Sequence, residues 1–171
     1  MLELAFLNKE ALSKQFIKIH SDIRYMYYFT STFLEYEVEI DSSSWSKIQQ
    51  VSKNKDGEII GYFSVNINRE SNNVSNVRMI NFQDKPSITF SKDMHTFLSS
   101  LFDIFSFNKI NWCVTIGNPA ENMYDKIVKN YNGRIVGVYE KEFKFINGKY
   151  YDTKVYEILK ENYDKRRKLN E

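Results

Sequence analysis

The sequence predicts a mixed α/β (α+β) fold, in which a central sheet of about seven strands carries helices on both of its faces. Two observations support this prediction. Short apolar runs of strand character alternate with long amphipathic segments, and Asn147-Gly148 separates two long segments rich in β-branched and aromatic residues. Because helical crossovers connect parallel strands and an Asn-Gly turn connects antiparallel strands, we expect both kinds of neighbour in one sheet.

The composition indicates a globular domain. The chain has 171 residues, of which 42% are hydrophobic and 16% aromatic. This content is enough for a buried core and unlike that of a disordered chain. We therefore expect one domain over residues 1–171, in which 160–171 form a basic C-terminal tail.

The charges and the cysteine content exclude several classes of function. The net charge is +2, from 24 basic and 22 acidic residues, which argues against a dedicated nucleic-acid partner. No apolar run is long enough for a membrane span, and the first residues lack the basic region of a signal peptide, so we expect a cytoplasmic protein. Cys113 is the only cysteine, which excludes an internal disulfide and a cysteine-based metal site, and we expect it to be buried in a strand.

The first half of the chain begins with a predicted strand at 2–6. Asn8 is expected to cap a helix with Leu12, Phe16 and Ile19 on its buried face. A second apolar face at helical spacing follows at 23–34, and strict alternation predicts a strand at 35–40. Residues 45–51 are ambiguous.

The middle of the chain contains two further predicted strands, at 59–67 and 77–82. Ser91 is expected to cap a helix whose broad apolar face runs down to Phe107. A buried strand is predicted at 110–116.

The last part of the chain is predicted to hold one helix and a hairpin. Asn118 caps the helix and Pro119 opens it, with Tyr124 on its apolar face. Strands are predicted at 134–146 and 149–159, on either side of the Asn-Gly turn.

This last block, residues 110–158, resembles the C-terminal half of the GCN5-related N-acetyltransferase superfamily. The order of strand, Asn-Pro helix start, inward-facing tyrosine and terminal hairpin is similar, and the predicted element order matches the acyl-CoA N-acyltransferase fold over nearly the whole chain. The resemblance implies that acetyl-CoA is a cosubstrate and that an amine, of unknown identity, attacks its thioester directly. It further implies that Asn118 binds the pantetheine arm and that Tyr124 protonates the departing thiolate. The separation of these two residues is one residue shorter than is usual in the family.

The loop that holds the pyrophosphate in this family departs from the family pattern. The family uses a glycine-rich turn there, whereas no glycine occurs between Gly61 and Gly117 in this chain. Within the corresponding loop, Pro86 lacks an N–H donor and Asp84 adds negative charge. The resemblance then leaves the phosphates to polar and basic side chains, which are Ser87, Ser91, Lys92, Lys85 and Thr89.

Each of these residues also has an ordinary structural interpretation. Asn118 would cap a helix in any fold, and Tyr124 would pack in any core. Arg78 either meets an anionic ligand or points outward. The aromatic group Tyr25, Tyr27, Tyr28 and Phe29 lines an acceptor pocket or fills the core. The alternatives to an enzyme are a catalytically inactive relative that binds another ligand or protein, and an interaction module that uses its aromatic-rich first half as the surface for a homodimer or for another partner.

Overall fold

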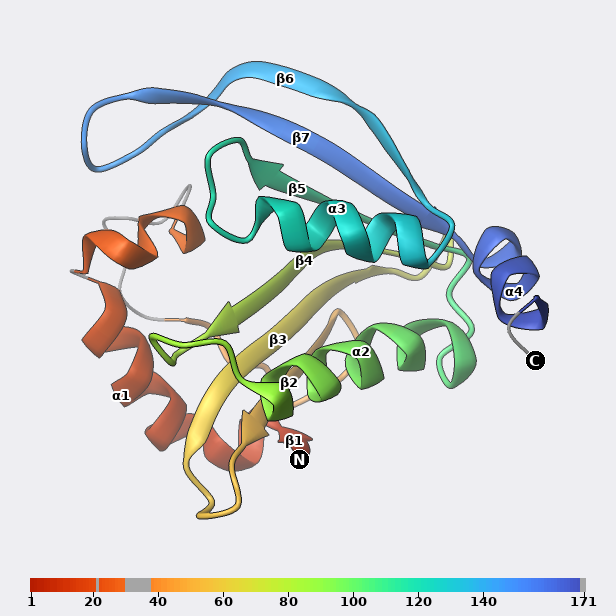
Figure 1. Cartoon of the computed structure of the whole chain (residues 1–171). Coiled ribbons are helices and arrows are strands. Elements are labelled where there is room, and N and C mark those ends of the chain that lie inside the picture. The colour runs from red at the N-terminus through yellow and green to blue at the C-terminus, as the bar shows by residue number, and fades with distance from the viewer. Residues whose placement is uncertain (21, 30–37, 170–171) are drawn as a thin grey trace.

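The computed structural model describes residues 1–20, 22–29 and 38–169. Within these ranges, one seven-stranded mixed sheet runs in the order β1-β2-β3-β4-β5-β7-β6 (Figure 1), which confirms the predicted fold class. The elements are β1 (Leu2–Leu4), η1 (Ala5–Asn8), α1 (Lys9–His20), η2 (Ile23–Tyr28), β2 (Lys47–Lys53), β3 (Ile59–Asn68), β4 (Asn73–Asn81), α2 (Ile88–Asp103), β5 (Lys109–Thr115), α3 (Glu121–Asn130), β6 (Arg134–Lys144), β7 (Tyr150–Leu159) and α4 (Lys160–Lys168), with η denoting a 3₁₀ helix.

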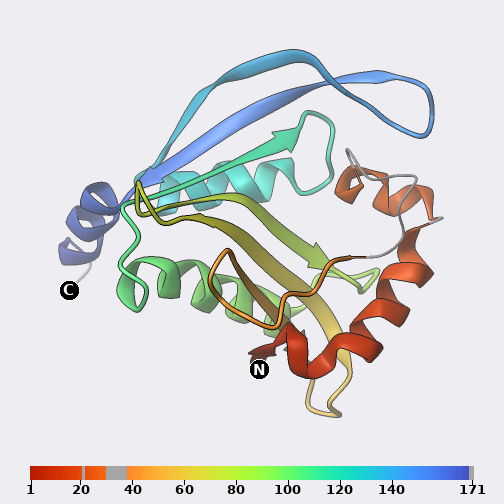
Figure 2. The same ribbon diagram turned by 180° about the vertical axis from the view of Figure 1, so that it is seen from behind.

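The sheet changes character at its centre. Strands β1 to β4 are antiparallel neighbours, and so are β5, β7 and β6. Between the two halves, β4 and β5 are parallel and pair only at Asn73–Lys109 and Val74–Ile110. Beyond Val74 the two strands separate, and the ribbon views from both sides show the gap between them (Figures 1 and 2).

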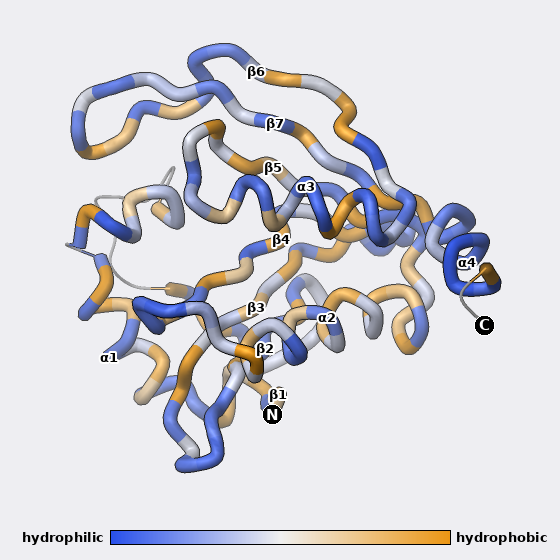
Figure 3. The backbone as a smooth tube through the Cα atoms, viewed as in Figure 1, coloured by the Kyte–Doolittle hydropathy of each residue, from blue (hydrophilic) through white to orange (hydrophobic). Residues whose placement is uncertain are grey.

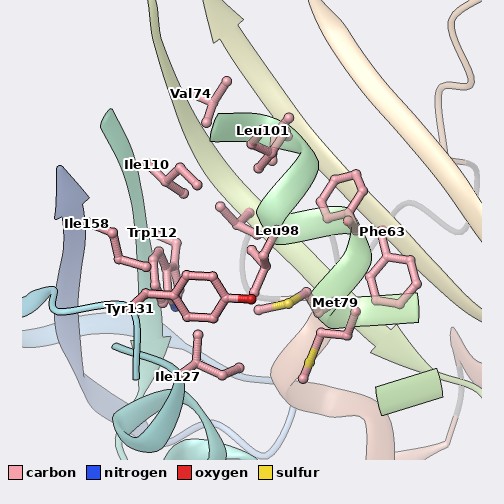
Figure 4. Close-up of a cluster of buried hydrophobic side chains, with 14 of the residues drawn as sticks. Phe63, Val74, Met79, Leu98, Leu101, Ile110, Trp112, Ile127, Tyr131 and Ile158 are labelled. Carbon is pink, nitrogen blue, oxygen red and sulfur yellow. The ribbon is translucent and has the colours of Figure 1, made fainter. Parts of the chain in front are cut away.

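Helices cover both faces of the sheet and define two hydrophobic clusters. The larger cluster lies between the sheet and helices α2 and α3, and Leu98 and Leu101 of α2 and Ile127 of α3 all belong to it (Figure 4). The smaller cluster holds the predicted stripe of α1, which is Leu12, Phe16 and Ile19, against Tyr62 and Ile80 of the sheet. Each helix is therefore placed by the burial of its own apolar face.

Strand β2 is the element that the sequence pattern misses. The strand predicted at 35–40 lies partly outside the described residues, and residues 38–40 are not in a strand. The strand next to β3 is instead β2, which begins at Lys47. Its pattern is obscured because Gln49 is buried: its amide donates to the Tyr62 hydroxyl at 2.7 Å and to the Glu39 carbonyl at 2.8 Å, while its oxygen accepts from the Asp41 N–H at 2.8 Å.

Two predicted helix starts are also displaced. Ser91 is not the cap of α2, because the helix begins at Ile88 and the Ser87 hydroxyl accepts from the Phe90 N–H at 3.3 Å. Ser91 lies in the first turn. Helix α3 begins at Glu121, so Asn118 and Pro119 belong to the turn that precedes it.

Two further segments, at 23–34 and 160–171, differ from expectation in the part that the structure describes. The second helical segment predicted at 23–34 is the short η2, and residues 30–37 lie outside the described residues. The predicted basic tail contains α4, which is hydrophilic along most of its length (Figure 3). Its Tyr163 is nevertheless buried, stacks on Phe102 and donates to Asp103 at 2.9 Å.

Strand β6 forms one edge of the sheet. Within β6, the side chain of Phe143 is half-buried and the side chains of all the other residues are exposed. Its register with β7 shifts between Tyr139 and Phe143, where Lys141 has a positive φ of 50° and its N–H donates to the Asp152 carboxylate at 2.8 Å. Across all the described residues, no helix is long and apolar enough to cross a membrane.

We predict that Gly61→Ala lowers the free energy of unfolding by about 1–3 kcal/mol, because a Cβ would overpack the core. A Cβ at Gly61 would lie 2.4 Å from Cδ2 of Phe90, whose ring is fixed by stacking on Phe63. The matched control is Gly137→Ala, where nothing lies within 4 Å. Urea denaturation of both variants checks this, and equal stabilities would contradict it.

Candidate active site

The candidate site lies where β4 and β5 separate. Each strand keeps its other neighbour, β3 for β4 and β7 for β5. Past Val74 and Ile110, the edges that face each other no longer pair, so their backbone N–H and C=O groups need other partners. Asn76 has a positive φ of 51° close to the point of separation. The gap therefore offers backbone groups to a ligand that enters between the strands.

Two cavities border this gap in the described part of the chain. The helix-side cavity, of about 430 Å³, lies between η2, the loop at 82–87 and the starts of α2 and α3. The hairpin-side cavity, of about 350 Å³, is lined mainly by β4 and β5, with Phe143 of β6 and Val155 of β7. Both cavities are lined by Tyr27, Tyr28, Met79 and Asn118. They therefore meet in the gap.

Tyr124 projects from α3 into the wall of the hairpin-side cavity. The residue is only 5% exposed, and its hydroxyl has no hydrogen-bond partner among the described residues. Burial is the main cause that raises the pKa of this phenol, and the neighbouring Tyr28 and Tyr156 add to the effect. A phenol with a raised pKa keeps its proton at neutral pH, as a proton donor must.

Asn118 lies in the turn between β5 and α3 and lines both cavities. Its side-chain oxygen accepts from the Ala120 N–H at 2.9 Å, and its carbonyl accepts from the Glu121 N–H at 2.8 Å. Its side-chain nitrogen makes no hydrogen bond to a described residue, so this donor is free for a ligand. The structure thus brings Asn118 and Tyr124, both singled out in the sequence, to one cavity.

An ionic network that sequence reasoning missed fixes the start of α3. Glu121 accepts from the Gly117 N–H at 2.9 Å and forms an ion pair with Lys154 of β7. Lys154 also pairs with Asp125 at 3.2 Å, and the Tyr156 hydroxyl donates to Asp125 at 2.6 Å. The hydrogen bond from Lys154 lowers the pKa of Glu121, and that from Tyr156 lowers the pKa of Asp125. The signal in the sequence is the i, i+4 spacing of two carboxylates on α3, facing a lysine in a strand.

The region proposed for phosphates is only partly assembled as the resemblance implies. Ser87, Ser91 and Lys85 line the helix-side cavity, whereas Lys92 is exposed and is not part of that lining. The Ser87 hydroxyl is already engaged as the cap of α2. No residue at 82–88 has a positive φ, so the loop does not form the turn that glycines would allow. The N–H groups of the first turn of α2 have no acceptor within the helix.

The negative charge of the same loop is neutralised by η2. Arg24 forms ion pairs with Asp84 at 2.7 Å and with Asp22 at 2.5 Å. Arg24 also lines the helix-side cavity. The Asp84 carboxylate is therefore held by a guanidinium at the place where an anionic ligand would enter.

The aromatic group of η2 divides between the two expected roles. Tyr27 and Tyr28 are half-buried and line both cavities. Tyr25 and Phe29 are buried in the cluster beside α1, and Tyr25 also lines the helix-side cavity. Burial, followed by the nearby Tyr25, raises the pKa of Tyr28 to about 12. Two phenols, of Tyr28 and Tyr124, therefore face the gap in their neutral form.

The prediction that Cys113 is buried is wrong. Its neighbours Trp112 and Val114 point to the larger hydrophobic cluster, so Cys113 faces the opposite side of β5. On that side the thiol is exposed and lines the hairpin-side cavity. Partial burial and then the charge of Glu142 raise the pKa of the thiol. No three His, Cys, Asp or Glu side chains of the described residues are placed to hold a metal ion.

No protein-family model and no curated protein matches the sequence, but solved structures do. A spermidine N-acetyltransferase from Vibrio cholerae, in complex with CoA and spermine, has a TM-score of 0.74 and 20% identity over 95% of this chain and 96% of its own. A second structure, of a spermidine/spermine N-acetyltransferase from Vibrio cholerae, has a TM-score of 0.61 and 25% identity over 72% of this chain and 71% of its own. A GCN5-related N-acetyltransferase from Brucella melitensis has a TM-score of 0.68 and 16% identity over 98% of this chain and 78% of its own.

These likenesses share the mixed sheet described above and extend over most of each chain. This chain therefore has the acyl-CoA N-acyltransferase fold that these GCN5-related N-acetyltransferases share.

Proposed function

We propose that this protein transfers the acetyl group of acetyl-CoA to the nitrogen of an amine. The observation that carries the proposal is the position of Tyr124, a neutral buried phenol whose unpaired hydroxyl borders the cavity in the gap between β4 and β5. Similar folds belong to N-acetyltransferases, one of which was solved with CoA and spermine.

The helix-side cavity would hold the cosubstrate. The unpaired edge of β4 and the free side-chain nitrogen of Asn118 supply donors and acceptors for the amides of a pantetheine arm. At its outer end, the N-terminus of α2 with Ser91 and Lys85 provides N–H groups and positive charge for phosphates. Lys92 lies outside this lining and is left out of the assignment.

The hairpin-side cavity would hold the acceptor amine. Its nitrogen attacks the thioester carbon, a C–N bond forms and the C–S bond breaks. Tyr124 donates its proton to the departing sulfur, and the proton lost by the amine restores the phenol through water. The phenol suits this role because it is neutral and within the cavity wall.

We predict that Tyr124→Phe lowers kcat about 10²- to 10⁴-fold, because it removes the proton donor and keeps the ring. The KM for acetyl-CoA should change little. The measurement is the release of free thiol with a panel of amines. The matched control is Tyr131→Phe at the other end of α3, whose hydroxyl contacts Ser99 at 3.3 Å outside both cavities; it should leave kcat unchanged. Equal kcat in wild type and Tyr124→Phe would refute the assigned role.

We predict that CoA and acetyl-CoA bind with micromolar dissociation constants in calorimetric titration. Asn118→Asp and Asn118→Ala should both weaken binding about 2- to 10-fold, since both remove the free N–H donor. Only Asn118→Ala should lower the free energy of unfolding, by about 0.5–2 kcal/mol, because the aspartate keeps an acceptor for the Ala120 N–H.

Two results of this titration would count against the proposal. If Asn118→Asp binds CoA as tightly as the wild type, Asn118 serves only to hold the turn before α3. If the wild type binds no CoA at millimolar concentration, the fold serves another ligand or a protein partner. The loop at 82–88, without a left-handed residue, is the observation that favours this second function.

We predict that the pKa of Tyr124 is also visible in the stability of the protein at alkaline pH. Below about pH 10 the phenol is protonated in both the folded and the unfolded chain. Above it, the unfolded chain loses this proton while the buried phenol keeps it, so the free energy of unfolding falls as pH rises. This fall should be less steep in Tyr124→Phe, as measured by urea denaturation between about pH 9 and pH 11. Parallel curves would show that the phenol is not perturbed.

A further inference from the structure

Arg78 is a half-buried cation inside the hairpin-side cavity. It lies on β4 opposite Ser64 of β3. Its side chain lines this cavity and an adjoining one of about 250 Å³ on the same side of the sheet. Among the described residues that line the hairpin-side cavity, Arg78 is the only one that carries a charge.

The guanidinium of Arg78 makes no hydrogen bond or ion pair with any described residue. The other arginines near the sheet behave differently, since Arg69 donates to two backbone carbonyls and Arg134 pairs with Glu157 at 2.7 Å. The carboxylate that lines the adjoining cavity, Glu39, is paired with Lys47. A cation withdrawn from water is stable only when it is paired. A guanidinium left without a partner in a cavity is therefore a site for an anion, and its planar fork fits an oxyanion.

We infer that the acceptor of this protein is a small amine that also carries an oxyanion, as an amino acid does, and that Arg78 binds this oxyanion. The inference rests on the proposed function, since Tyr124 of the same cavity marks where the amine reacts. The cavity, of about 350 Å³, suits a molecule of the size of an amino acid. Uncharged polar groups of Asn111, Asn76 and Thr115 complete its lining.

The same charge opposes a polyamine. A polyamine carries several positive charges and needs carboxylates around it. The described part of the hairpin-side cavity has none in its lining and adds the positive charge of Arg78. Like charges at short range repel each other most strongly where water is excluded. The spermidine acetyltransferases therefore share the fold with this chain, and the inference assigns it a different class of acceptor.

The first experiment compares matched acceptors by thiol release. The wild-type protein receives acetyl-CoA with one acceptor at a time. The acceptors are a mixture of the nineteen free amino acids other than cysteine, whose thiol would react in the assay, the mixture of their amides, O-phosphoethanolamine, ethanolamine and spermidine. Acceptors with an oxyanion should have a kcat/KM about 10- to 100-fold above their neutral counterparts, as for a hydrogen bond to a charged group. The amino acids and O-phosphoethanolamine distinguish a carboxylate from a phosphate.

Substitution of Arg78 makes this test specific. Arg78→Gln should remove the preference for the oxyanion and leave kcat/KM for the amides unchanged, whereas Arg78→Lys should keep part of the preference. Since Arg78 has no partner among the described residues, Arg78→Gln should unfold at the same urea concentration as the wild type. A preference that survives Arg78→Gln, or amides and spermidine used as well as amino acids, would overturn the inference.

A second readout needs no turnover and uses the thiol of Cys113 in the same cavity. The amino acid mixture should slow the reaction of Cys113 with the neutral reagent 4,4′-dithiodipyridine more than the amide mixture does, and Arg78→Gln should abolish the difference. Protection without thiol release from any acceptor would sustain the anion site and refute acetyl transfer. Thiol release with no selective protection and no oxyanion preference would sustain acetyl transfer and refute the role of Arg78.

Discussion

The separation of β4 and β5 is the constraint on which the site depends. Two parallel strands that stay paired would leave no space between them, yet here pairing stops after Val74 and Ile110. Both strands remain in the sheet because each keeps an antiparallel neighbour on its other side. The gap therefore costs only a few backbone hydrogen bonds at the centre of the sheet, and these are the groups that a ligand can satisfy. Both cavities border this gap.

The gap is useful only if α3 holds its residues against it. Burial of the apolar face of α3 sets its distance from the sheet, but a hydrophobic contact does not fix rotation about the helix axis. The ion pairs of Lys154 with Glu121 and Asp125, and the hydrogen bond from Tyr156 to Asp125, fix this rotation. They connect the helix to β7. Tyr124, which lies between these two acidic positions in sequence, is turned toward the gap as a result.

Elements with one strong local signal could be predicted from the sequence, and those that depend on a distant partner could not. The hairpin at Asn147-Gly148, strand β3 and the face of α3 follow from turn chemistry and periodicity. Strand β2 does not, because Gln49 is buried on account of Tyr62, which is remote in sequence. The same limit explains Cys113: its apolar neighbours suggest a strand buried on both faces, while only the tertiary structure shows that one face is open. Asn118 and Tyr124 can be predicted because their order along the chain is itself the signal, whereas the partners of Lys154 lie on another element.

The irregular course of β6 has a consequence for the behaviour of the protein at high concentration. A regular edge strand offers a row of free backbone groups to any other chain and invites sheet-to-sheet aggregation. Here the register breaks between Tyr139 and Phe143, and the three residues in between are Glu140, Lys141 and Glu142. The break interrupts the row of backbone groups. The three charged side chains would also have to lose their hydration if another strand paired with this edge. The exposed Ile135, Val136 and Val138 nearby are thereby confined to a short stretch. We therefore expect this edge of the sheet to resist aggregation at high protein concentration.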